Sequence, residues 1–195
     1  MTRDAVWRTY RDFLERVTEE MLEVVAERFG GGLSGKAARL GAKRVTKRIN
    51  DEMYDQGELV VDYAAAVAAG DADRMAYERE FLETNPVYTR YSGDRTAELE
   101  SHLLDHFEAV AADLAPLVAS ETDDFWVALR EEFDREQAEE IVDRQFSQAE
   151  TFKQYRDGIF SSERLGDRVI DVVETAEARF KQQLHEELAA VYDER

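Results

Sequence analysis

The sequence predicts an all-α protein: a single domain over residues 1–195, folded as a multi-helix bundle of about six or seven helices with no β-sheet. Apolar residues recur at every third or fourth position along most of the chain, which is the period of a helix with one buried face. Pairs of glycine and aspartate separate these stretches, and such pairs are typical of a helix end followed at once by a helix start. No stretch alternates apolar and polar residues between turn residues, as a strand would.

Two long helical patterns open the chain. The first covers 7–25, where apolar residues follow i, i+3, i+4 and i+7 spacing and glutamates fall toward the other side. The glycines at 30–32 end it. The second is expected over 34–55, with a serine at its start as a cap. Gly57 then predicts a break before a separate alanine-rich stretch over 58–69.

Glycine–aspartate pairs mark three further helix boundaries: Gly70-Asp71, Gly93-Asp94 and Gly166-Asp167. A different stop is expected at Asn85-Pro86, because the residue before a proline avoids the helical region. We therefore expect a helix from 71 to 85, a loop after it, and a helix over 94–118 with Pro116 in its last turns.

The last third of the chain carries a long helical pattern whose phase slips. Apolar residues before and after Asp134 lie on different helix faces, and Asp134 and Gln137 have the spacing of a capping box. This predicts a break or kink near Asp134. Gly158 closes the region, and a final long helix over about 162–192 is expected to bury its apolar stripe.

The charge balance is extreme for a small domain. The chain has 44 acidic and 25 basic residues and a net charge of −19, whereas solubility alone needs a net charge of only about 2 to 8. Arginine outnumbers lysine 20 to 5, and the acids are spread along the chain instead of forming a tail. This pattern favours a cytosolic protein of a high-salt organism over an acidic protein that mimics or binds something basic.

Several classes of protein are excluded or disfavoured by composition. The chain has no cysteine, so disulfides, thiolate nucleophiles and cysteine metal sites are excluded. No apolar run approaches the roughly 20 residues that cross a bilayer, and the N-terminal residues do not form a signal peptide. We therefore expect a cytoplasmic protein with no transmembrane segment and no cofactor.

A basic island stands out against this acidity: residues 28–50 carry seven basic side chains and no acidic one. Over 36–49 these form one face of a predicted amphipathic helix, whose opposite face has small residues that suit packing on a neighbouring helix better than insertion into a membrane. The basic face is the candidate binding surface for a protein partner or nucleic acid: Lys36, Arg39, Lys43, Arg44, Lys47 and Arg48. Alternatively, these cations neutralise carboxylates of adjacent helices.

The same segment resembles a helix-turn-helix. Residues 37–41 and 44–49 provide a small residue, a turn glycine at Gly41 and a basic second helix. The chain length and the helical remainder would suit a TetR-like transcriptional regulator, and the resemblance implies DNA binding by segment 36–49.

Two other patterns carry weaker chemical signals. Residues 30–37 nearly match a phosphate-binding loop, but Ala37 replaces the hydroxyl residue that holds magnesium, and the context is helical. Glu98, His102 and His106 have i, i+4, i+8 spacing, so a metal site on one helix stays open as an alternative to a partly exposed histidine pair.

No enzyme signature emerges, since carboxylate pairs cannot be singled out among so many acids. The sequence therefore predicts a non-enzymatic helical interaction protein, which binds a protein partner or associates with itself. A helix-turn-helix regulator is the alternative. The sequence leaves the oligomeric state and any small-molecule ligand open.

Overall fold

We describe the protein from a computed structural model, which places residues 1–29, 32–84, 97–160 and 162–193. At some helical positions the description covers the backbone alone: 29, 32–39, 41–46, 48–50, 52, 84 and 158. The described chain is helical without strands, which confirms the all-α prediction. Its nine helical segments are α1 (Arg3–Phe29), α2 (Gly32–Ala69), α3 (Ala72–Thr84), α4 (Ala97–Ala119), α5 (Phe125–Glu132), α6 (Arg135–Gln145), α7 (Gln148–Gln154), α8 (Arg156–Ile159) and α9 (Glu163–Asp193). The number exceeds the six or seven expected because residues 125–159 divide into four short segments, the last a single turn.

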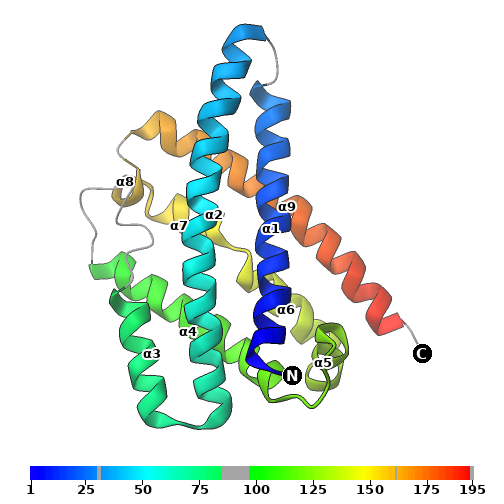
Figure 1. The fold of residues 1–195 in the computed structure, drawn as a ribbon. Coiled ribbons are helices and arrows are strands. Elements are labelled where there is room, and N and C mark those ends of the chain that lie inside the picture. The colour runs from blue at the N-terminus through cyan, green and yellow to red at the C-terminus, as the bar shows by residue number, and fades with distance from the viewer. Residues whose placement is uncertain (30–31, 85–96, 161, 194–195) are drawn as a thin grey trace.

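α1 and α2 form a long antiparallel hairpin whose far end, where α1 stops and α2 begins, extends beyond the other helices (Figure 1). The helix expected over 7–25 is confirmed, and α1 extends it by about a turn at each end. Six residues of its predicted apolar stripe are buried and Trp7 is half-buried; the six are Tyr10, Leu14, Val17, Met21, Val24 and Val25. Val6 and Phe13, which the pattern did not include, are buried beside them.

The break predicted at Gly57 is wrong, because α2 is one uninterrupted helix of 38 residues. Gly57 lies against α1: a Cβ built there would stand 3.0 Å from Cε1 of Tyr10 and 3.1 Å from Cδ1 of Leu14. A glycine inside a helix costs about 1 kcal/mol relative to alanine. Here the missing side chain permits the close approach of two helices, and the packing offsets that cost.

The other predicted boundaries divide into confirmed and wrong ones. Gly70 has φ +64°, and the Asp71 carboxylate accepts a hydrogen bond from the backbone N–H of Arg74 at 3.0 Å, so this pair ends α2 and begins α3 as expected. α3 ends at Thr84, directly before Asn85-Pro86. The pair at 93–94 lies outside the described residues. The pair at 166–167 is not a boundary, since it lies inside α9.

The predicted break at Asp134 is confirmed in detail. The Asp134 carboxylate accepts a hydrogen bond from the backbone N–H of Gln137 at 2.9 Å, and the Gln137 side chain accepts one from the backbone N–H of Asp134 at 3.0 Å. This reciprocal capping box starts α6. It also explains the phase slip, because α5 and α6 are separate helices that turn different faces to the core.

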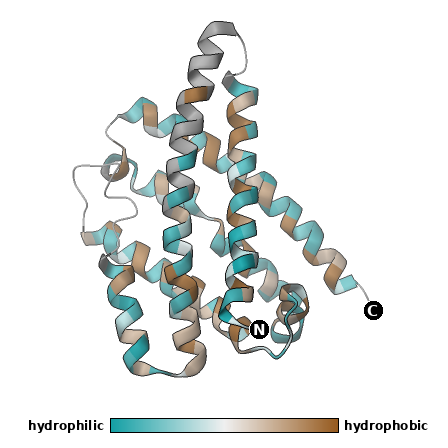
Figure 2. Cartoon of the chain, viewed as in Figure 1, coloured by the Kyte–Doolittle hydropathy of each residue, from teal (hydrophilic) through white to brown (hydrophobic). Residues whose placement is uncertain are grey.

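α9 crosses behind the hairpin and completes the core (Figure 1). Apolar residues recur along it between hydrophilic ones (Figure 2), as the sequence pattern predicts. Phe180, fully buried at its middle, lies edge-on to Phe146 with ring centroids 4.9 Å apart and also contacts Phe13 of α1. The guanidinium of Arg16 covers the same Phe180 ring at 5.1 Å and binds Glu187. Aromatic packing therefore joins α1, the C-cap residue of α6 and α9.

Candidate functional site

The predicted basic surface lies on the first half of α2, toward the end of the hairpin that extends beyond the other helices (Figure 1). The backbone over 36–49 is helical, as expected for an amphipathic segment. The side chain of Lys47 is exposed. The side chains of the other five candidate cations lie outside the described residues: Lys36, Arg39, Lys43, Arg44 and Arg48.

Leu40 adds an apolar group to this segment that the sequence reasoning missed. Its side chain is 65% exposed, the highest value among the exposed large apolar residues of the described chain. Leu40 and Lys47 are seven residues apart, so they lie on the same face of α2, two turns from each other. This face of α2 therefore presents a leucine and, two turns further on, a lysine to solvent.

The helix-turn-helix geometry expected for 37–49 does not form in the described backbone. A helix-turn-helix needs a short turn between two helices. α2 instead continues without interruption through Gly41. Likewise, residues 32–37 belong to the first turns of α2, so this part of the phosphate-loop-like stretch is helix and not loop.

Arg28, the first cation of the basic island, is engaged inside the fold. At the end of α1 it forms an ion pair with Asp171 of α9, and its Nη2 donates a hydrogen bond to Oγ1 of Thr175 at 2.8 Å. This single cation therefore behaves as the neutralising interpretation expects. Because its guanidinium holds α1 to α9, Arg28 is not part of the candidate binding surface.

The residues of the possible metal site do not come together. Glu98 is exposed, whereas Nε2 of His102 lies 3.2 Å from Oγ1 of Thr151 and its ring packs against Tyr155. His106 turns to the interior, where burial and the neighbouring His102 lower its pKa to about 4. Within the described ranges no group of three histidine, aspartate or glutamate side chains could hold a metal ion.

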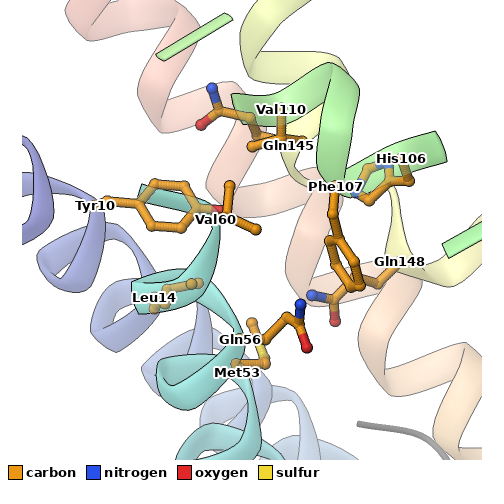
Figure 3. A pocket seen from close by; sticks show the side chains of 11 residues that line it. Tyr10, Leu14, Met53, Gln56, Val60, His106, Phe107, Val110, Gln145 and Gln148 are labelled. Carbon is orange, nitrogen blue, oxygen red and sulfur yellow. The ribbon is translucent and has the colours of Figure 1, made fainter. Parts of the chain in front are cut away.

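A small pocket bordered by five helices was not foreseen. We call it the polar chamber after five of its lining residues: Tyr10, Gln56, His106, Gln145 and Gln148. These come from α1, α2, α4, α6 and α7, and Gln56 and Gln148 point toward each other across it (Figure 3). Its volume is about 30 Å³. The sequence held one signal for it, since Gln56 interrupts the apolar stripe that Met53 and Val60 form on α2.

A buried carboxyl group lies between α7 and α9. Glu177 of α9 accepts hydrogen bonds from the backbone N–H groups of Gln148 at 2.8 Å and Ala149 at 3.1 Å. It therefore caps α7, whose own N-cap residue Ser147 makes no such side-chain bond. Burial raises the pKa of Glu177 to about 7, against the opposing effect of these two hydrogen bonds and of Lys181.

Comparison of the chain with protein-family models, with curated proteins and with solved structures gives no match. Across the part of the chain that the structure describes, no helix is both long and apolar enough to span a lipid bilayer. The function therefore has to be inferred from the residues and their placement.

Proposed function

We propose that the protein is a non-enzymatic helical interaction protein, and that its binding surface is segment 36–49 in the first half of α2. The observation that carries this proposal is the exposed pair Leu40 and Lys47 on one face of α2. Protein interfaces combine a central apolar contact with a charged rim. An exposed leucine beside cations meets that description.

The charge of the segment indicates the chemistry of the partner. Segment 36–49 has six cations and no acid, in a chain whose net charge is −19. At an ionic strength near 0.15 M the Debye length is about 8 Å, so a partner at contact distance senses the local cations more than the distant acids. The partner that fits is an acidic protein surface with an apolar patch, and the acidic face of a second copy is one such surface.

Paired substitutions separate this proposal from nucleic-acid binding, the function that the helix-turn-helix alternative implies. Lys43→Gln with Lys47→Gln removes two charges from the segment. Lys153→Gln with Lys181→Gln removes two lysines that pair with Glu174 and Asp143 elsewhere, and is the matched control. Leu40→Asn removes the apolar contact, and Leu165→Asn, at an exposed leucine of α9, is its control.

The readouts are self-association by sedimentation velocity and the anisotropy of a labelled acidic polypeptide and of a labelled DNA duplex. We expect concentration-dependent self-association or polypeptide binding that weakens about tenfold in the double lysine variant, a loss of about 1.4 kcal/mol. Self-association should also weaken in Leu40→Asn, and both controls should match the native protein. DNA binding that depends on the two lysines but not on Leu40 would replace the proposal with nucleic-acid binding. If the native protein binds neither probe and stays monomeric, the proposal fails.

A further inference from the structure

The side-chain amide of Gln56 is buried and has no hydrogen-bond partner among the described residues. Gln56 is only 4% exposed, and neither its Oε1 nor its Nε2 has a partner among the described groups. A buried amide that loses water without gaining a hydrogen bond is unfavourable, and such groups in folded proteins are almost always bonded to protein or to ordered water. Both ends of this amide therefore need a partner.

The polar chamber beside Gln56 has the size that such a partner requires. Its volume is about 30 Å³, and a cavity needs roughly 10–15 Å³ to hold one water molecule. The chamber thus has room for one or two waters. Its wall supplies the further contacts, since an ordered water typically makes about three hydrogen bonds. Amides from Gln145 and Gln148, an imidazole from His106 and a phenol from Tyr10 line it.

The chemistry of the wall favours water over an ion. None of the polar groups that line the chamber is a carboxylate, a guanidinium or an ammonium. His106 is neutral near pH 7, because burial lowers its pKa to about 4. An ion here would be buried without a counter-charge, which is strongly unfavourable. Water is neutral and both donates and accepts hydrogen bonds. It can therefore bond to the Nε2 donor and to the Oε1 acceptor of Gln56, which both lack partners.

We infer that the polar chamber is a structural hydration site, in which one or two long-lived water molecules complete the hydrogen bonds of the Gln56 amide and link α2 to polar groups on α4 and α7. The site is independent of the surface proposed above. It sits at the base of the hairpin, where α2 enters the bundle between α1 and α4. A satisfied buried polar network fixes the position of a helix more specifically than apolar packing does.

Water relaxation and NMR test this inference on the full chain. In the native protein, the Gln56 side-chain amide protons should show cross-peaks to water with the sign of a long-lived complex. ¹⁷O relaxation dispersion measures the number of long-lived water molecules in each protein molecule. This number should be lower by one or two in Gln56→Met than in the native protein. Methionine keeps the length of the side chain without its hydrogen bonds. Gln182→Met, at an exposed glutamine of α9, is the matched control and should leave the dispersion unchanged.

The native cross-peaks decide the matter even where Gln56→Met fails to fold. If the native Gln56 amide protons show no contact with long-lived water, the chamber is not a hydration site. The same conclusion follows if the dispersion amplitudes of Gln56→Met and the native protein are equal. A change in the native Gln56 resonances on addition of a monovalent salt, at constant water signal, would assign the site to an ion and overturn the inference.

Discussion

The buried Glu177 carboxyl group couples the stability of this protein to pH in a direction opposite to that of most acids. An acid that is paired in the folded state usually stabilises a protein as it ionises. Glu177 is different, because the loss of water around its charge outweighs the two backbone hydrogen bonds that it accepts at the start of α7. Its pKa is raised from the ordinary 4.5 to about 7.

The size of the effect follows from that difference in pKa. Between pH 4.5 and about 7 the folded protein holds this proton more tightly than the unfolded chain does. The contribution of Glu177 to stability is therefore fully present below pH 4.5 and is lost as the pH rises through about 7. A pKa difference of about 2.5 corresponds to about 3 kcal/mol, of which about 2.5 kcal/mol falls between pH 5 and pH 8.

Glu177→Gln isolates this term, because glutamine keeps the shape of the protonated acid and does not titrate. Urea unfolding at pH 5 and pH 8 measures the free energy of unfolding of both proteins. Relative to the native protein, the variant should gain about 2–3 kcal/mol between the two pH values, or about 1 M in urea midpoint. Glu186→Gln, at an exposed glutamate of the same helix, is the surface control. A pH-independent difference for Glu177→Gln would refute the reasoning, and so would a variant that becomes relatively less stable as the pH rises.

Three further substitutions test other parts of the fold by urea unfolding. Burial lowers the pKa of His106 from 6.5 to about 4, so the native protein loses about 3 kcal/mol of stability as the pH falls through this range. The variant His106→Gln has no such group and should lose less stability over the same range. An identical pH profile in the two proteins would contradict this. Gly57→Ala should destabilise the protein by about 1 kcal/mol. Crowding of the new methyl group against α1 costs about 1–3 kcal/mol, and the better helix propensity of alanine returns about 1 kcal/mol. A stabilised variant would show that α1 and α2 do not pack as described. Asp134→Ala removes the capping box and should cost about 1 kcal/mol, and no loss would mean that packing alone sets the start of α6.

The boundaries that the sequence predicted correctly are those that neighbouring residues determine. The turn at Gly70-Asp71 needs a left-handed residue and a cap, and the start of α6 needs the Asp134–Gln137 pair; both requirements can be read within four positions. The long stripes of α1 and α9 are equally local, since the helical period is visible in the sequence. These elements were therefore accessible without knowing any tertiary contact.

The two glycines that were misread as helix ends have tertiary reasons for being glycine. A Cβ at Gly57 would meet Trp7, Tyr10 and Leu14, and a Cβ at Gly166 would stand 3.1 Å from Cδ2 of Phe160. At Gly57 the crowding comes from another helix, about 40 or more positions away along the chain. Local rules assign such a glycine to a helix end because they register only its poor helix propensity.

The polar chamber was hidden for a related reason. Gln56 visibly interrupts an apolar stripe, which marks it as a buried polar residue. Its neighbours His106 and Gln148 come from α4 and α7, far away in the sequence. A single helix pattern therefore indicates that a polar group is buried but does not show what surrounds it.

The ion pairs at the end of α1, close to the start of α2, bear on whether the basic segment is structural or functional. If its cations served to neutralise neighbouring carboxylates, the acids at the end of α1 and the facing part of α9 would be their natural partners. Glu27 is instead bound by Arg179 of α9 at 2.7 Å, and Asp171 is bound by Arg28 of α1. These two acids are thus already paired with cations from outside segment 36–49. The neutralisation of Glu27 and Asp171 therefore does not depend on segment 36–49.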